Sequence, residues 1–287
     1  MYCIFALFLI GSPIILSAQT GFGGLQMSRG ARTAAMADIG TALISSETKN
    51  PAALPIGNGK SYTFSHTSWI QGIQQENLHL IYKRPSQSWG FHARNWRSED
   101  LDYRVGPSEE PLGTFGIYEF TFGLSHVRNI YNNIRAGTRI SFLRQGIYDS
   151  DAIGWTMDIG IIQPLKSDIH WGVSLLNLGR VSPLDKVSTP LPTELQIGLS
   201  VQRDKNIQMV VELHKIDGNN ITLHYGSAYQ FNEPITLRFG YQNLKNKMLS
   251  LGASLMINKW NFDYSYQPFG ENLGHVHRIN LRLVSKH

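Results

Sequence analysis

Residues 221–242 read ITLHYGSAYQFNEPITLRFGYQ, and this stretch decides the fold. In both halves a large apolar residue is followed by a polar or small one, and Asn232-Glu233-Pro234 separates the halves. A period of two places successive side chains on opposite faces of a β-strand, and Asn and Pro are common in tight turns. The stretch therefore predicts two antiparallel strands, 220–231 and 235–242, each with one apolar face and one polar face.

The same alternation continues along most of the chain from Ser61 onward. Most of the segments approach the 9–11 residues that a tilted strand needs to cross a bilayer, and their number is even, as in single-chain bacterial barrels. We therefore predict an all-β fold, a transmembrane antiparallel β-barrel of about 14 strands. The predicted strands are 61–69, 77–83, 88–97, 117–126, 133–143, 153–163, 169–177, 194–202, 207–214, 220–231, 235–242, 248–257, 260–267 and 277–284. Longer loops are expected near residues 98–116 and 179–192.

Alternation also occurs in a secreted, soluble β-sandwich, and composition favours the barrel. Charged residues make up 16% of the chain, against about 25% in a typical soluble domain. The polar face is rich in Gly, Ser, Thr and Gln and carries charges of both signs, which suits an enclosed lumen where charges must pair. Trp and Tyr recur near the strand ends, where interfacial girdles lie. The predicted lumen charges are Arg94, Glu119, Arg135, Arg139, Asp158, Glu212, Arg238, Asp263 and Arg282.

Three regions are expected: a signal peptide over 1–18, a plug over 19–59 and the barrel over 60–287. Ile4 to Leu16 is almost wholly apolar but short for a membrane helix, and cleavage is expected after Ala18. Ser28 to Ser46 is rich in small residues at nearly helical spacing. It predicts a short helix or loop that packs in the barrel mouth.

Asn50, Pro51 and Ala52 form a turn motif directly before the first strand. As a structural element, Asn50 would cap backbone groups and Pro51 would fix the turn. As a functional element, the motif would hold a plug that gates the lumen. Both roles remain open at this level.

The sequence contains no catalytic signature. It has no G-x-S-x-G elbow, no glycine-rich phosphate loop and no H-E-x-x-H. His275 and His277 could share one strand face, but no third ligand lies near them in sequence. We therefore expect no enzymatic activity, no cofactor and no metal site. The net charge of +5 is scattered rather than clustered, which excludes nucleic acid as an expected partner.

Several short motifs follow one another along the chain. Near the N-terminus they are Arg29-Gly30-Ala31-Arg32-Thr33-Ala34-Ala35-Met36-Ala37-Asp38 and Asn50-Pro51-Ala52-Ala53-Leu54. The middle of the chain contributes Leu112-Gly113-Thr114-Phe115, Leu176-Asn177-Leu178-Gly179 and Pro190-Leu191-Pro192-Thr193. Near the C-terminus they are Tyr266-Gln267-Pro268-Phe269-Gly270 and His277-Arg278-Ile279-Asn280-Leu281. In this order, the motifs resemble those of the PorV/PorQ family of outer-membrane proteins, which are relatives of FadL-type channels.

The resemblance implies a FadL-like barrel in the outer membrane, linked to type IX protein secretion as a component or a surface-attachment platform. Its implied partners are outer-membrane lipid and secretion-system components or secreted cargo. The alternative function is a FadL-like passive channel for hydrophobic solutes.

Overall fold

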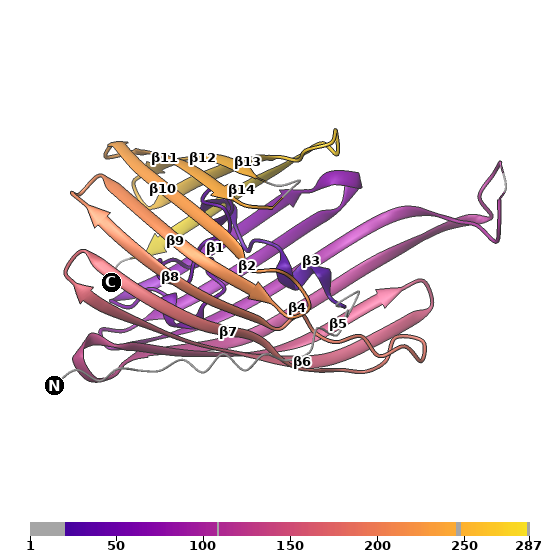
Figure 1. Ribbon diagram of the computed structural model, residues 1–287, viewed down its shortest axis with the longest axis horizontal. Helices are drawn as coiled ribbons and strands as arrows, with labels where there is room; N and C mark the ends of the chain where they lie inside the picture. Colours follow the sequence, from indigo (N-terminus) through magenta and orange to yellow (C-terminus); the bar gives the residue numbers. More distant parts are fainter. Residues whose placement is uncertain (1–20, 108, 245–247, 286–287) are drawn as a thin grey trace.

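The computed structural model describes residues 21–285 apart from residue 108 and residues 245–247. In these residues fourteen antiparallel strands form one closed barrel, in which each strand pairs with its sequence neighbours and β1 pairs with β14 (Figure 1). The predicted all-β barrel is confirmed. The strands are β1 Gly59–Ser68, β2 Gln74–Lys83, β3 Gln87–Tyr103, β4 Gly113–Asn129, β5 Arg135–Ile147, β6 Ser150–Lys166, β7 Ile169–Val181, β8 Glu194–Arg203, β9 Ile207–Ile216, β10 Thr222–Asn232, β11 Ile235–Gln242, β12 Leu249–Ile257, β13 Trp260–Pro268 and β14 His275–Ser285.

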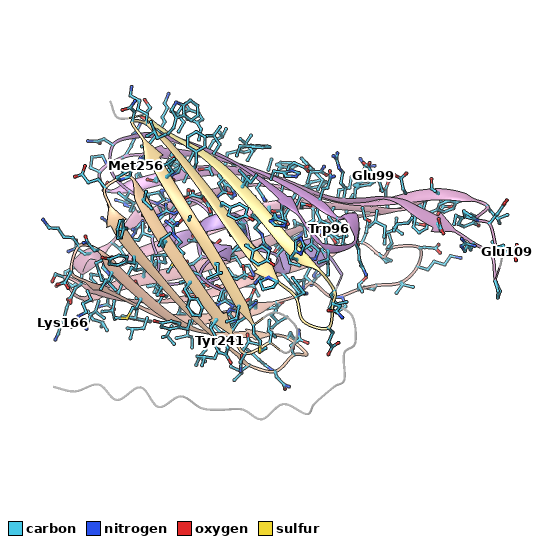
Figure 2. The ribbon with its side chains drawn as sticks, turned by 90° about the horizontal axis from the view of Figure 1, so that it is seen from above. Trp96, Glu99, Glu109, Lys166, Tyr241 and Met256 are labelled. Carbon is cyan, nitrogen blue, oxygen red and sulfur yellow. The ribbon has the colours of Figure 1, made fainter. Side chains whose placement is uncertain are left out.

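The prediction of a loop over 98–116 is wrong for much of its length. Strands β3 and β4 continue past the barrel rim to Tyr103 and from Gly113, so this hairpin projects well beyond the other strands (Figure 1). Glu109 lies near its tip (Figure 2). A bulge at Asp100, whose φ is 57°, shifts the register and breaks the alternation that would have marked the extension.

The two ends of the barrel differ. One end, here called the turn end, carries the connections 84–86, 130–134, 167–168, 204–206, 233–234 and 258–259. The other, here called the loop end, carries the longer connection 182–193 and the projecting hairpin. Short 3-10 helices, η3 Ile70–Gly72 and η4 Tyr131–Asn133, lie in two of the connections.

The barrel wall is apolar outside and polar inside. In β1, Ser61, Thr63, Ser65 and Thr67 point inward and are buried, whereas Phe64 on the other face is 49% exposed. A wall with an apolar outer face can lie in lipid only if its backbone is fully paired, and closure of the sheet provides that pairing. None of the described helices is both long and apolar enough to cross a membrane.

Residues 21–58, here called the plug, fill the lumen. The plug starts at the loop end, where Gly21 N donates to Pro190 O (3.1 Å), and finishes at the turn end, where Gly57 N donates to Arg84 O (3.1 Å). It therefore runs the length of the lumen rather than sitting only in the mouth. It contains η1 Gly23–Gln26, α1 Ala31–Ala34 and η2 Pro51–Ala53. The predicted signal peptide lies outside the described residues.

Helix α1 is a single turn inside the segment 28–46, for which the small-residue spacing predicts a short helix or loop. Ala37 and Asp38 have left-handed φ values of 61° and 62°, which end the helix after about one turn. Met36 and Ile39 are nonetheless buried, and they pack against Val210 of the wall. The spacing therefore identified buried positions but not the backbone conformation.

Candidate functional site: the plug and its seat in the barrel wall

Glycines in the wall make room for the plug. Gly137 of β5 and Gly160 of β6 pair across the sheet and face the turn at Asn50 and Ala52. A Cβ at Gly160 would lie 1.9 Å from Asn50 Oδ1, and one at Gly137 would lie 2.3 Å from Ala52 N. No other residue type fits at either position without moving the plug. Four more wall glycines approach the plug within 2.6 Å of an added Cβ: Gly172, Gly226, Gly240 and Gly252.

Asn50 organises the turn that precedes β1. Its Oδ1 accepts a hydrogen bond from Ala52 N (2.9 Å), and its Nδ2 donates to Thr41 O (2.6 Å). Pro51 occupies the first position of η2, where a missing N–H costs nothing. The side chain of Asn50 therefore ties two distant parts of the plug together while it caps the short helix.

Glu212 of β9 binds the middle of the plug. Its carboxylate accepts hydrogen bonds from three consecutive amides, Gly40 N (3.0 Å), Thr41 N (2.7 Å) and Ala42 N (3.3 Å), and from Thr41 Oγ1 (2.9 Å). Hydrogen bonds to an ionised acceptor are roughly twice as strong as neutral ones. The amides of the plug backbone therefore stabilise this buried negative charge.

His214 joins Glu212 to a second carboxylate. Its Nε2 lies 3.0 Å from Glu212 Oε2 and its Nδ1 lies 3.2 Å from Glu194 Oε1, so each ring nitrogen faces a carboxylate oxygen, which favours the imidazolium form. Lys49 of the plug approaches Glu194 (3.4 Å), and His224 stacks on His214 with ring centroids 3.9 Å apart. We call Glu194, Glu212 and His214 the plug clamp.

The polar groups of the plug clamp bind one another and the plug. Each of its polar groups already has a protein partner, and Glu212 is saturated by plug donors. Throughout the part of the chain that the structure describes, no cluster of His, Cys, Asp and Glu has the arrangement of a metal site.

Arg139 and Asp158 form a second attachment. Arg139 Nη1 lies 3.0 Å from Asp158 Oδ2 and also donates to Lys49 O (2.7 Å), while its Nη2 donates to Thr48 O (3.2 Å). Asp158 in turn accepts from Asn177 N (2.8 Å) at a bulge in the β6–β7 pairing. The bulge turns an extra backbone amide toward the carboxylate.

Arg94 and Glu119 hold the start of the plug through a single residue. Arg94 Nη1 donates to Gly24 O (2.7 Å), and Gly24 N donates to Glu119 Oε2 (2.8 Å). At the other end of the plug, Arg135 donates to Leu54 O. Both ends are therefore bound through backbone atoms.

Arg238, Asp263 and Arg282 lie on strands β11, β13 and β14 and face the lumen. Asp263 Oδ1 lies 3.9 Å from Arg238 Nη1 and equally far from Arg32 Nε of the plug. Glu47 of the plug lies in the same region, near Asp263, Arg32 and Arg282. This cluster therefore contains charged residues from both the wall and the plug.

All nine predicted lumen charges therefore lie on the inner face, eight of them buried and Arg282 half-buried. We expected them mainly to pair with one another, and Arg139 with Asp158 does so. Arg238 also approaches Asp263, at 3.9 Å. Five of the nine bind plug backbone: Arg94, Glu119, Arg135, Arg139 and Glu212. The sequence analysis missed Lys49, Glu194, His214 and His224. Alternation could have identified Glu194 and His214, because they share the inward phase of Gln196 and Glu212.

A cavity of about 570 Å³ lies over the plug clamp at the loop end. Glu194, His214 and Lys49 contribute to its lining. Its apolar lining comes from Met27 of the plug and from Trp69, Ile216 and Leu244 of the wall and connections. The volume falls within the range of about 300–1,000 Å³ that small-molecule sites occupy.

No known family and no curated protein matches this sequence. Solved structures do match it, over nearly the whole described chain. The chain is similar in fold to solved hydrocarbon channels. The CymD monoaromatic hydrocarbon channel superposes with a TM-score of 0.68 at 13% identity, covering 91% of this chain and 98% of that one.

Two further structures agree. The toluene transporter TbuX of Ralstonia pickettii gives a TM-score of 0.62 at 12% identity, and a FadL homologue of Pseudomonas aeruginosa gives 0.61 at 11% identity. Each comparison covers 90% of this chain and 98% of the other. At identities this low, the superpositions establish a shared barrel fold. They thereby support the FadL-like architecture expected from the sequence motifs.

Proposed function

We propose that this protein is an outer-membrane channel that admits a hydrophobic solute, without cofactor and without covalent chemistry. The observation that carries the proposal is the loop-end cavity, which combines apolar lining from Met27, Trp69, Ile216 and Leu244 with a floor made by the plug. A cavity of this kind can hold an apolar molecule beside the part of the molecule that blocks the lumen. The shared fold with hydrocarbon channels supports the same function.

The proposed orientation follows from the unequal ends. Outer-membrane barrels place short turns in the periplasm and longer loops outside the cell. The turn end would then face the periplasm and the loop end the exterior. A solute from outside would meet the loop-end cavity before it met the plug.

In this arrangement the plug must move for a solute to pass. In the described wall every strand pairs with both neighbours, and the plug runs through the enclosed lumen. The contacts of Glu212 with Gly40, Thr41 and Ala42 join the plug to the wall below the cavity. We propose that their rearrangement controls passage.

Filling the loop-end cavity tests this function. Ile216 faces the cavity, whereas Leu213 on the same strand faces outward and is 46% exposed. We expect Ile216→Trp to abolish most uptake of labelled toluene by cells that depend on this channel, and Leu213→Trp to leave it unchanged. Equal uptake by wild type, both variants and cells without the protein would exclude the channel function.

A surface-attachment platform is the second candidate, and the projecting hairpin favours it. The β2–β3 pairing ends at Gln74 and Arg97, so residues 98–103 of β3 have no described strand on that side. An unpaired edge is a template for a strand from another protein. Such an edge outside the membrane would suit secreted cargo or a type IX secretion component, as the motif resemblance implies.

Shortening the hairpin tests the second candidate. Ser98 pairs with Ile117, so residues 99–116 can be replaced by Asn-Gly, which closes a two-residue hairpin. If the platform function is correct, secretion components or cargo co-purify with the wild type in mild detergent and are lost from the shortened variant. Toluene uptake by the shortened variant separates the two candidates, because the channel function predicts no change.

A further inference from the structure

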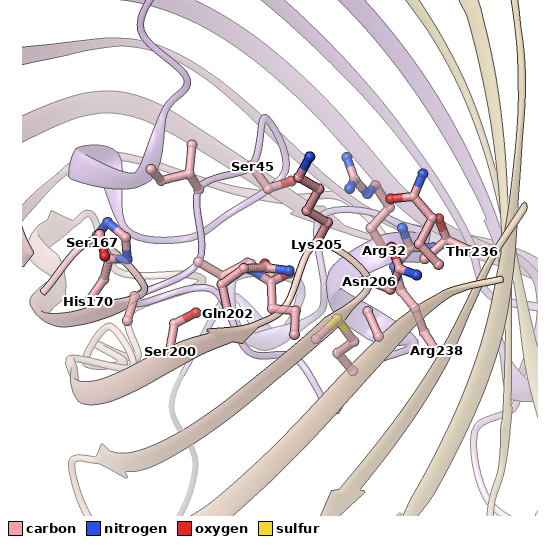
Figure 3. Close-up of a pocket in the computed structure, with 17 residues that line it drawn as sticks. Arg32, Ser45, Ser167, His170, Ser200, Gln202, Lys205, Asn206, Thr236 and Arg238 are labelled. Carbon is pink, nitrogen blue, oxygen red and sulfur yellow. The ribbon is translucent and has the colours of Figure 1, made fainter. Parts of the chain in front are cut away.

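A second cavity, of about 380 Å³, lies on the opposite side of the plug, at the turn end (Figure 3). Ser167 of the β6–β7 turn and Asn206 of the β8–β9 turn contribute to its lining, which places it near the end of the barrel that carries the short turns. Its volume is within the range of ligand pockets. The proposed binding of a solute in the loop-end cavity does not involve this second cavity, because the two have different lining residues.

The charges that line this turn-end pocket are all positive. Arg32 comes from the plug, Lys205 from the β8–β9 turn and Arg238 from β11, and no Asp or Glu belongs to the lining of the described pocket. Figure 3 shows the three cationic side chains gathered on one side, with His170 across the pocket. Three independent elements thus direct cations into one space.

The carboxylates behind the pocket do not cancel these charges. Asp263 lies 3.9 Å from both Arg32 and Arg238, so one negative charge is shared by two guanidinium groups. Glu47 and Arg282 lie in the same region. Even with Asp263 and Glu47 both ionised, the three lining cations and Arg282 exceed them by two positive charges. A ligand with two negative charges would neutralise this excess positive charge.

The remaining lining adds an apolar surface. Met36, Leu43 and Ile44 of the plug and Ala228 of β10 belong to the same pocket, and Ile44 is 44% exposed. An exposed isoleucine next to a cationic cluster matches a ligand with one anionic end and one hydrocarbon end. Burial of hydrocarbon contributes about 0.8 kcal/mol per CH₂.

We propose that this turn-end pocket binds a phosphomonoester that carries an alkyl chain. The phosphate would lie among Arg32, Lys205 and Arg238, and the chain would lie along Leu43 and Ile44. A phosphate monoester carries close to two negative charges at neutral pH, and Arg and Lys are its usual protein donors. A carboxylate of equal chain length carries one charge and leaves the pocket positive.

Calorimetric titration of the purified full chain in non-ionic detergent tests this proposal. Hexyl phosphate is the probe, with hexanoate and inorganic phosphate as comparators. We expect hexyl phosphate to bind about tenfold more tightly than either comparator, because only hexyl phosphate uses both the charge and the apolar wall. Binding should weaken as salt is added.

Two variants locate the site. Lys205→Gln and Arg32→Gln should each weaken hexyl phosphate binding about tenfold, the usual scale for losing one charged hydrogen bond. Lys205 lies in an exposed turn, so its replacement leaves the fold intact. Lys259→Gln is the matched control, because Lys259 also lies in an exposed turn at the turn end but outside the pocket lining.

Each outcome decides part of the proposal. If inorganic phosphate binds as tightly as hexyl phosphate, the apolar lining does not contribute to binding. If hexanoate binds as tightly as hexyl phosphate, the pocket does not prefer a dianion. Lys205→Gln and Arg32→Gln variants that bind like Lys259→Gln would show that the ligand lies elsewhere. A failed toluene uptake experiment leaves this binding result untouched, since the two tests address different cavities.

Discussion

The single side chain of Glu212 accepts several hydrogen bonds from the plug, so replacing it should weaken the attachment of the plug. In Glu212→Gln the carboxylate that accepts from Gly40, Thr41 and Ala42 becomes a neutral amide, and His214 loses one of its two anionic partners. Removing one member of a buried charge pair typically costs about 3–5 kcal/mol. We expect a loss of that order in the free energy of unfolding in phospholipid vesicles, and a rise in single-channel conductance.

Glu76→Gln is the control for this prediction. Glu76 also lies near a histidine, His66, at 3.5 Å, but this pair lies on the outer face and is partly exposed. Exposed pairs contribute little to stability. Unchanged conductance in both variants would mean that Glu212 does not hold the plug in place.

Gly160 gives a second prediction at the residue scale. A Cβ there would overlap Asn50 Oδ1, so Gly160→Val must displace the turn at Asn50. Overpacking of a filled interior usually costs about 1–3 kcal/mol. Gly113→Val is the control, because nothing lies within 4 Å of a Cβ at Gly113. Thermal melting followed by circular dichroism should show a lower Tm for Gly160→Val only; equal Tm values would contradict the tight fit.

At the scale of elements, the strands could be predicted because their signal is local. The period-two pattern needs only neighbouring residues, and fourteen predicted segments correspond to fourteen observed strands within the described residues. The extension of β3 and β4 beyond the barrel rim was not predicted, because the bulge at Asp100 changes the phase of the alternation. The end of helix α1 could not be predicted, because small-residue spacing contains no information about the left-handed backbone at Ala37 and Asp38.

The route of the plug could not be predicted, because its contacts are remote in sequence. Gly24 binds Glu119, which is 95 residues away, and Gly40 binds Glu212, which is 172 residues away. Alternation identifies Glu119 and Glu212 as inward residues but contains no information about which amide each one accepts from. The wall charges were therefore predictable as a set, and their partners were not.

The short helix η2 provides a prediction for an element. Asn50→Ala removes both the cap on Ala52 N and the bond to Thr41 O, whereas Asn50→Asp keeps a cap acceptor and loses only the donor. Loss of a helix cap costs about 1 kcal/mol. We expect the backbone amide of Ala52 to exchange with deuterium faster in folded Asn50→Ala protein than in wild type, with Asn50→Asp between them. Equal exchange rates would show that the cap does not order this turn.

For the whole molecule, the balance of plug and wall charges predicts the effect of deleting the plug. Without residues 21–56, Arg94, Arg139 and Glu212 would lose the backbone groups that they bind. Water would replace the plug, because unpaired charges require solvation. We expect a barrel with a lower unfolding temperature and a permanently open conductance in planar bilayers. A deletion variant that folds but remains closed would mean that other segments block the lumen.

The direction of the plug has a consequence for folding order. Residues 21–58 lie inside the lumen and lead directly into β1, whose partner at the closing seam is β14, with Lys60 opposite Ser285. The seam joins the first strand to the last, which is a contact of very high sequence separation and so is slow to form. In the simplest folding order, residues 21–58 first pack against the wall glycines. The β1–β14 pairing then forms last and encloses this segment in the lumen. Substitutions at that seat should then slow refolding rather than speed unfolding.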